Sequence, residues 1–181
     1  DGEMHLGLRK EHMPFFKPGH VEELQKKVSA KVTELLDGIA PLGECNLVHH
    51  VSQQLPIFTL SEVLGIPEED RQKLVSWMEF LELAQYFTYE MIKEQNEGKT
   101  DSTPDPAMIE MFNAMVDEMF DYGRFILKNK RKNPSNDLLS AIANAKIEGE
   151  ELSDEFLDGS WLLIIFAGND TTRNTMSGGI K

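Results

Sequence analysis

Apolar residues recur at steps of three and four along most of this chain, the spacing that gathers them on one face of a helix. One such stripe runs from Val21 to Ile39 and ends before Pro41, a residue that does not continue a helix. The clearest stripe runs from Met108 to Ile126. Methionine-rich stripes can form adaptable ligand surfaces, but they are more often plain core. The pattern predicts two long amphipathic helices.

The same spacing predicts further helices between and after these two. A helical stretch over residues 47–64 contains Pro56, which should kink or split it. Pro67 and the acidic residues after it suit the first turn of the next helix. Residues 96–106 have the composition of a loop, and a short helix is expected over residues 137–146. Because there is no internal repeat and no convincing pair of strands, the predicted fold class is all-α.

The last segment begins with a helix start signal and contains no proline. Ser153 is a candidate N-cap with two acidic residues behind it, and the stretch to Lys181 would be a helix of about 28 residues. Residues 161–167 form the longest apolar run, which is too short to cross a bilayer that needs about 20 residues. Taken alone, this run could equally be a buried strand that ends in a turn, and periodicity leaves both assignments open.

Polar residues follow this apolar run directly, in the sequence AGNDTT of residues 167–172. In a helix they would form a strip of small and polar side chains, and the hydroxyl of Thr171 could donate to the carbonyl of Ala167 and open the helix locally. Alternatively, one helix ends at Gly168 and its neighbouring asparagine, and Asp170 or Thr171 caps the next helix. Local reasoning favours this second arrangement.

The charge balance excludes some classes of partner. The chain has 18 basic and 31 acidic residues, so its formal net charge of -13 argues against binding to nucleic acid. A basic cluster over residues 128–133 is the local exception, and its place at the end of a helix suits the helix dipole. The single cysteine excludes an internal disulfide and a zinc site with several cysteines.

Two motifs point to one family. AGNDTT resembles the Ala/Gly-Gly-x-Asp/Glu-Thr-Thr signature in the long central helix of the cytochrome P-450 superfamily, the haem-thiolate monooxygenases. The sequence before it, PSNDLLSAIANAKIEGEELSDEF, resembles the same family's approach to that helix. Near the start, HLGLR resembles the His-x-x-x-Arg of the family helix that crosses the haem propionates. The motifs stand in the family's order with helices between them, so the resemblance spans essentially all 181 residues.

The resemblance implies the central part of the mainly helical cytochrome P-450 fold, ending within the long oxygen-activating helix. Residues 1–181 would form one partial domain, an internal fragment truncated at both ends. The implied cofactor is haem b, whose propionates His5 and Arg9 would bind. These two residues are four apart, hence on one face of a helix, and together they offer donors to a pair of carboxylates.

The resemblance also assigns roles within AGNDTT. Asp170 would relay protons, through water or a salt-bridge switch, and the Thr171 hydroxyl would hold the activated oxygen. A hydroxyl both donates and accepts, so it suits that position better than alanine or valine. Ala167 and Gly168 would let dioxygen and the porphyrin approach the backbone, and Thr172 would be a helper or a packing residue.

Two further family motifs are missing from these residues. The iron-binding loop Phe-x-x-Gly-x-x-x-Cys-x-Gly and the Glu-x-x-Arg motif are both absent, as expected for a fragment. Cys45 lies before the central helix, in LGECNL, without the phenylalanine and glycines of that loop. We interpret it as a structural or incidental thiol and not as the iron ligand, so this chain alone is not expected to be active.

The form of the motifs resembles one group within the cytochrome P-450 superfamily. His-x-x-x-Arg resembles the soluble bacterial enzymes, which implies a cytoplasmic protein that receives electrons from NAD(P)H through a ferredoxin and a ferredoxin reductase. TTRNTMSGG resembles bacterial groups that hydroxylate alkanes, fatty acyl chains, terpenes or sterol side chains, which implies a hydrophobic substrate. The family fold would place residues 78–111 over the substrate pocket. Its apolar side chains there could line the access route or be ordinary core: Phe80, Leu83, Tyr86, Phe87 and Tyr89.

Two other classes of function stay open at this point. A non-catalytic, all-helical ligand-binding domain would use the methionine stripe as its pocket and AGNDTT only as a helix junction. It predicts that the complete protein binds no haem. An interaction module would present its acidic surface to a basic partner, and it predicts that Thr171→Ala changes stability slightly and nothing else.

Overall fold

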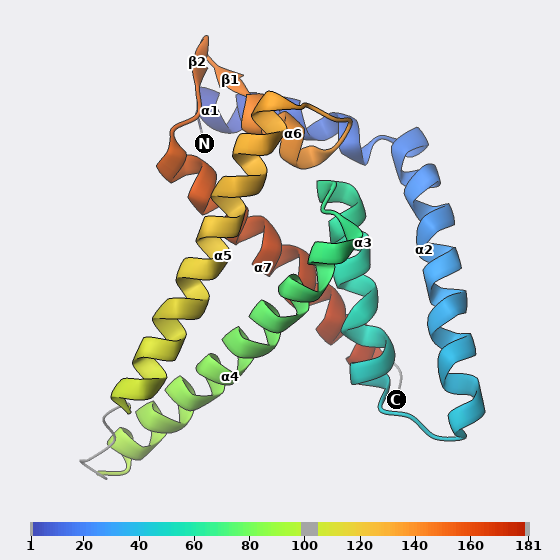
Figure 1. The fold of residues 1–181 in the computed structure, drawn as a ribbon, viewed down its shortest axis with the longest axis vertical. Coiled ribbons are helices and arrows are strands. Elements are labelled where there is room, and N and C mark those ends of the chain that lie inside the picture. The colour runs from blue at the N-terminus through green and yellow to red at the C-terminus, as the bar shows by residue number, and fades with distance from the viewer. Residues whose placement is uncertain (1, 99–104, 180–181) are drawn as a thin grey trace.

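Helices make up nearly all of the structure, a computed structural model that describes residues 2–98 and 105–179 (Figure 1). The α-helices are α1 (Glu3–His12), α2 (Pro18–Ile39), α3 (Gln54–Leu64), α4 (Arg71–Asn96), α5 (Pro106–Lys132), α6 (Leu138–Asn144) and α7 (Asp154–Gly179). Shorter helical turns are η1 (Met13–Phe16), η2 (Ala40–Leu42), η3 (Val48–Ser52) and η4 (Glu68–Asp70). An antiparallel hairpin of β1 (Lys146–Ile147) and β2 (Glu150–Glu151) precedes α7. The predicted all-α class is confirmed, although the hairpin was not predicted.

Prolines and glycines set several helix boundaries where the sequence indicated them. The stretch over residues 47–64 is split, because Pro56 lies in the first turn of α3, where its missing N–H has no intrahelical partner to lose. Gly65 ends α3 in the left-handed region, with φ 68°, which a residue with a Cβ adopts at a cost. Ser153 caps α7, since its hydroxyl accepts from the N–H of Phe156 at 3.2 Å. Part of the predicted loop, residues 99–104, lies outside the described residues.

Helix α7 crosses the structure diagonally, and both α3 and α5 pack against it (Figure 1). At the crossing with α5, Trp161 is 1% exposed and its Nε1 donates to the carbonyl of Met119 at 3.0 Å. Trp77 of α4 and Tyr122 of α5 join it in an aromatic cluster whose ring centroids are 5.4 to 6.5 Å apart. The absence of a side chain at Gly123 makes room for the indole, because a Cβ there would lie 2.5 Å from Trp161. This cluster fixes α7 relative to α4 and α5.

Asp137 joins the ends of three helices. Its carboxylate accepts from Nζ of Lys130 and from the hydroxyl of Ser135, both at 2.5 Å, and from the N–H of Ser140 at 2.8 Å. The last bond caps α6, and Gly65 at the end of α3 lies so close that a Cβ there would be 2.3 Å from Asp137 Oδ2. Burial raises the pKa of Asp137, but the hydrogen bonds and the Lys130 charge outweigh it, so the pKa lies below its usual value.

The basic cluster at the end of α5 is part of this framework. Besides Lys130, Arg131 donates from Nε to the carbonyl of Ala143 at 2.7 Å and from Nη2 to the carbonyl of Leu152 at 3.1 Å. These bonds fasten α5 to the segment between α6 and α7. The cluster therefore lies at a helix end, as predicted, and two of its cations bind within the protein. Within the described residues, no helix has both the length and the apolar character needed to cross a membrane.

Candidate functional site

The sequence AGNDTT lies in the interior of α7, which is helical without interruption from Asp154 to Gly179. The helical assignment of the apolar run is confirmed, and the alternative in which one helix ends near Gly168 is wrong. Packing against α3 and α5 explains this, because the buried side chains Trp161, Ile165 and Asn169 recur every four residues on the inner face. Tertiary contacts therefore override the local preference of glycine and asparagine for a helix end.

Exposed side chains recur every four residues along the outer face of α7, and we call this row the lane. Leu163 is 67% exposed, and Ala167 and Thr171 follow it at steps of four residues, both exposed. The Thr171 hydroxyl donates to the carbonyl of Ala167 at 3.0 Å, as predicted, and Thr175 repeats this bond to the carbonyl of Thr171 at 2.8 Å. The helix stays regular at this point, so the predicted local opening is not seen. Both threonine hydroxyls still have lone pairs to accept a hydrogen bond.

Asp170 stands beside this lane with one of its oxygens already engaged. Its side chain is 59% exposed, and Oδ1 accepts from Nδ2 of Asn174 at 2.9 Å. Nη2 of Arg173 lies 3.9 Å from the same oxygen. The other carboxylate oxygen has no hydrogen-bond partner among the described residues, so it is available to exchange a proton with water or a ligand.

Gly168 and Asn169 lie away from the lane, since Gly168 packs against α3 and Asn169 is buried. A Cβ at Gly168 would lie 2.7 Å from Cδ1 of Leu60, so the missing side chain lets α7 and α3 approach each other. Asn169 is 1% exposed, and its Oδ1 has no hydrogen-bond partner in the described structure. Packing thus explains the glycine at position 168 on its own, and its contact with a cofactor stays a prediction.

His5 and Arg9 lie on one exposed face of α1, as their spacing predicted. Within the described residues, neither side chain forms an ion pair or a hydrogen bond. α1 itself is held by α6 and β1, where Gly7 lies directly against the side chain of Ile147. The packing of α1 therefore fixes the backbone that carries His5 and Arg9. Within the described residues, their side chains remain free to donate to a ligand with acceptors.

These features fit the haem that the sequence motifs imply. The exposed lane at Ala167 and Thr171 offers a flat group close approach to α7, because its side chains are small. The donors of His5 and Arg9, which have no partner among the described residues, suit a group with two carboxylates. Cys45 is an exposed free thiol in the segment between η2 and η3, so it does not lie on α7 or on α1. No cluster of metal-binding side chains is present among the described residues.

An apolar cavity of about 230 Å³ lies between α4 and α5. Phe80, Leu83 and Phe87 of α4 line it, opposite methionine, isoleucine and phenylalanine side chains from the first turns of α5. Tyr86 and Tyr89 are 59% and 64% exposed and are not among its lining residues. Of the five apolar side chains expected near the substrate route, three therefore line one cavity and the two tyrosines do not.

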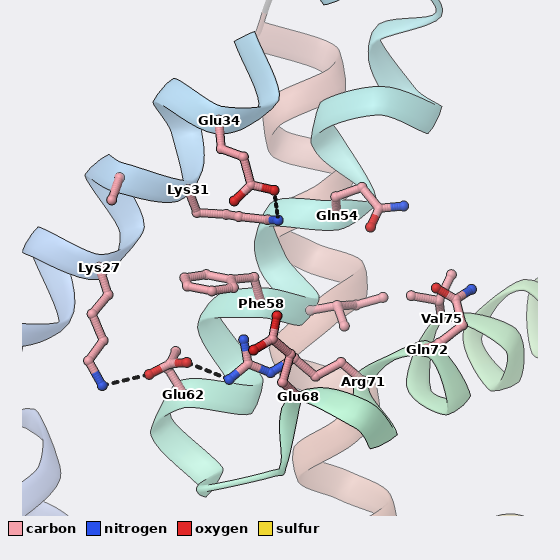
Figure 2. Close-up of a pocket in the computed structure, with 12 residues that line it drawn as sticks. Lys27, Lys31, Glu34, Gln54, Phe58, Glu62, Glu68, Arg71, Gln72 and Val75 are labelled. Carbon is pink, nitrogen blue, oxygen red and sulfur yellow. Dashed lines mark hydrogen bonds and ion pairs between the residues drawn. The ribbon is translucent and has the colours of Figure 1, made fainter. Parts of the chain in front are cut away.

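A second cavity, of about 570 Å³, lies between α2, α3 and the start of α4 (Figure 2). Five of its charged side chains pair within the protein: Glu62 accepts from Lys27 at 2.7 Å and from Arg71 at 2.5 Å, and Lys31 bonds to Glu34. Burial raises the pKa of Glu62, but the hydrogen bonds and charges of its two partners outweigh this, so the pKa is lowered. The ion pairs tie α2 to α3 and α4, and we assign this cavity a structural role.

Comparison with known proteins gives relatives along the whole chain, although no family model matches it. A steroid C26-monooxygenase of Mycolicibacterium smegmatis is 28% identical over 180 residues, which is 99% of this chain and 38% of that protein. A cytochrome P-450 of Bacillus subtilis is 31% identical over 173 residues, 96% of this chain and 38% of that protein. The chain thus spans about two fifths of the length of these curated relatives.

Solved structures give the same answer for the fold. A cytochrome P-450 of Mycobacterium marinum in complex with pseudoionone matches with a TM-score of 0.78 and 28% identity, covering 100% of this chain and 41% of that one. A cytochrome P-450 of Bacillus megaterium in complex with corticosterone matches with a TM-score of 0.74 and 26% identity, covering 99% and 44%. The resemblance inferred from the two motifs is confirmed: this chain is related to cytochromes P-450 over its whole length.

Proposed function

We propose that this chain is the part of a haem-thiolate monooxygenase that binds one face of the haem and delivers protons during oxygen activation. The observation that carries the proposal is the exposed surface of α7, where the carboxylate of Asp170 and the hydroxyl of Thr171 follow each other in sequence and Thr171 lies one turn after the small residue Ala167. Haem, when bound, supplies the iron at which dioxygen is reduced and one of its atoms is inserted into a substrate. The protein residues have the tasks of binding, orienting and moving protons.

Five residues would contact the cofactor or the reacting atoms. His5 and Arg9 would hold the two propionates, since their donors are exposed, lie on one face of α1 and have no partner in the described part of the chain. Ala167 would let the porphyrin lie close to α7. The Thr171 hydroxyl would accept one hydrogen bond. It would donate another after it rotates away from the carbonyl of Ala167, to which it donates in this structure. Gly168 would contribute through its backbone, because its missing side chain faces Leu60.

Asp170 would supply the protons that the Thr171 hydroxyl passes on. Its side chain is exposed, and one of its oxygens is free of hydrogen bonds within the described residues. A carboxylate in that position can take a proton from water and release it to a neighbouring hydroxyl. Because Asn174 binds only Oδ1, the other oxygen keeps its lone pairs available for such a transfer.

The iron ligand and the electrons would come from outside these residues. Cys45 is exposed and lacks the sequence of the family's iron-binding loop, so the thiolate would belong to another part of the complete protein. Electrons would pass from NAD(P)H through a ferredoxin reductase and a ferredoxin, in the cytoplasm of a bacterium.

The proposed substrate is a hydrophobic small molecule such as an alkane, fatty acyl chain, terpene or sterol. The apolar lining of the cavity between α4 and α5 supports this choice, since phenylalanine and methionine side chains offer no partner to a charged ligand. The names of the relatives point the same way, because they mention a steroid monooxygenase, pseudoionone and corticosterone.

The spectrum of the complete protein tests the proposal. After reduction and addition of carbon monoxide, we expect the absorption shift that marks a thiolate-bound haem, and we expect it to persist in a Cys45→Ser variant. A complete protein that takes up no haem during expression would contradict the proposal and favour an all-helical ligand-binding domain. Loss of the thiolate spectrum in Cys45→Ser would overturn our placement of the iron ligand.

A further inference from the structure

The methionine-rich stripe of α5 divides into two parts with different surroundings. In the middle of the helix, Met119 is 2% exposed and lies in the core. In the first turns, Met108 and Met111 are 36% and 51% exposed and line the apolar cavity between α4 and α5, which Met91 of α4 also lines. Plain core therefore describes the middle of the stripe, whereas its first turns present thioether groups to a cavity.

The rest of the cavity wall offers almost no polar partner. The rings of Phe80 and Phe112, whose centroids are 5.8 Å apart, join α4 to α5 at this wall. Thr88 is the one polar residue that lines the cavity in the described structure, and its hydroxyl donates to the carbonyl of Ala84 at 2.8 Å. A polar oxygen formed in this cavity would therefore find no uncommitted donor among the described side chains that line it.

The methionine sulfurs can form such an oxygen, because peroxide oxidises a thioether. The sulfur lone pair attacks one peroxide oxygen, the O–O bond breaks and an S–O bond forms. The sulfur loses two electrons and the peroxide leaves as water, so the product is a polar sulfoxide on the same side chain. A buried sulfur reacts slowly, since peroxide must reach it.

We propose that Met108 and Met111 are sites of oxidation by hydrogen peroxide, and that their sulfoxides weaken the binding of apolar ligands in this cavity. The peroxide would come from turnover in which electrons reach oxygen but not the substrate, and in that respect the proposal rests on the proposed function. A sulfoxide oxygen loses its hydrogen bonds to water when an apolar ligand enters, which should weaken binding about tenfold. Accumulating peroxide would thus reduce the uptake of ligand at this cavity.

Peptide mass spectrometry after treatment of the complete protein with dilute hydrogen peroxide tests the first part. We expect sulfoxide at Met108 and Met111 before any appears at Met119 or at Met78, which is 4% exposed in α4. The two buried methionines are internal controls for the peroxide dose, and circular dichroism confirms that the protein stays folded. Equal rates at all four methionines of the folded protein would overturn the proposal.

Binding of Nile red, a neutral dye that fluoresces in apolar surroundings, tests the second part. Leu83→Asn changes the cavity wall and should weaken binding, which shows that the dye occupies this cavity. Peroxide should weaken binding about tenfold in the wild type. It should have little effect in the double variant Met108→Leu with Met111→Leu, because leucine is apolar, similar in volume and without sulfur.

Two controls separate these methionines from the others. Met13 is 53% exposed in η1 and does not line the cavity, so Met13→Leu should give no protection against peroxide. Methionine sulfoxide reductases should restore dye binding in the oxidised wild type, because they convert the sulfoxide back to the thioether.

Three results of the dye experiment would overturn the proposal. They are an equal loss of binding in the wild type and the double variant, no loss in a wild type oxidised at Met108 and Met111, and unchanged binding in Leu83→Asn. Added peroxide oxidises methionine without haem, so these results are separable from the proposed function. A complete protein without a thiolate haem spectrum refutes the monooxygenase, whereas a normal spectrum with any of these three results refutes only the role of the methionines.

Discussion

Removing the Asp137 carboxylate should destabilise the protein more than removing any exposed acid. Asp137 and Lys130 have side chains that are 8% and 15% exposed, and their ion pair is supported by the hydroxyl of Ser135 and the N–H of Ser140. Asp137→Ala would leave a buried ammonium without its partner, which costs about 3 to 5 kcal/mol, and would also remove the cap of α6, worth about 1 kcal/mol. The two losses overlap, so we expect a total of about 4 kcal/mol.

Asp137→Asn separates the two contributions. The amide oxygen can still accept from the N–H of Ser140, so the cap is kept and the negative charge is lost. We expect this variant to cost about 2 kcal/mol, less than Asp137→Ala. Urea unfolding of the complete protein, followed by circular dichroism and tryptophan fluorescence, gives both free energies. Asp121→Ala is the matched control, because Asp121 is 78% exposed and pairs with Arg124 within one helix.

The pH dependence provides a second test of the same ion pair. The pKa of Asp137 is lower in the folded protein than the value of about 3.9 in an unfolded chain. A group of this kind contributes stability that is present above its unfolded pKa and is lost as the pH falls through its folded pKa. The difference in unfolding free energy between wild type and Asp137→Asn should therefore shrink below about pH 4. The reasoning would be refuted if Asp137→Ala lowered the free energy of unfolding by no more than Asp121→Ala does. It would also be refuted if the difference in unfolding free energy between wild type and Asp137→Asn stayed constant down to pH 3.

Three glycines inside α5 and α7 should respond differently to replacement by alanine. Gly123→Ala should cost about 1 to 3 kcal/mol in urea unfolding, because the new Cβ meets the ring of Trp161. At Gly159 of α7 a new Cβ would meet no atom of the described residues within 4 Å, so Gly159→Ala should stabilise the protein by about 0.5 to 1 kcal/mol. An equal effect of Gly123→Ala and Gly159→Ala would contradict the packing. Gly168→Ala should be destabilising because the new Cβ meets Leu60. The loss of unfolding free energy in the double variant Gly168→Ala with Leu60→Ala should be smaller than the sum of the losses in the two single variants. A strictly additive pair would show that Leu60 is not what requires the glycine.

The sequence predicted the helices well because their signals are local or periodic. Apolar spacing located α2, α4 and α5, Pro56 marked the split before α3, and Ser153 marked the start of α7. The hairpin before α7 escaped notice because its strands have two residues each, too few to show alternation. The interruption expected at Gly168 is absent because contacts with α3 and α5, which no local rule contains, keep α7 continuous.

Part of the candidate site could be predicted because its signals are also local and periodic. The spacing of His5 and Arg9, and the bond from Thr171 to the carbonyl of Ala167, follow from helix geometry alone. The ion pair of Arg173 with Glu82 joins residues of two helices that are far apart in sequence, and no periodicity indicates it. An arginine within a strip of small and polar residues was the available signal, and only the packing of α4 beside α7 gives it a partner.

The yield of product per electron in Thr171→Ala tests the central claim most directly. In the complete protein, this variant should keep its haem spectrum and substrate binding while most electrons from NAD(P)H end in peroxide or water, and Thr171→Ser should restore the yield. The reason is that alanine removes the hydroxyl that stands on the outer face of α7 beside Asp170. An unchanged ratio of product formed to NAD(P)H consumed in Thr171→Ala would contradict the role given to this hydroxyl and, with it, the proposed proton path.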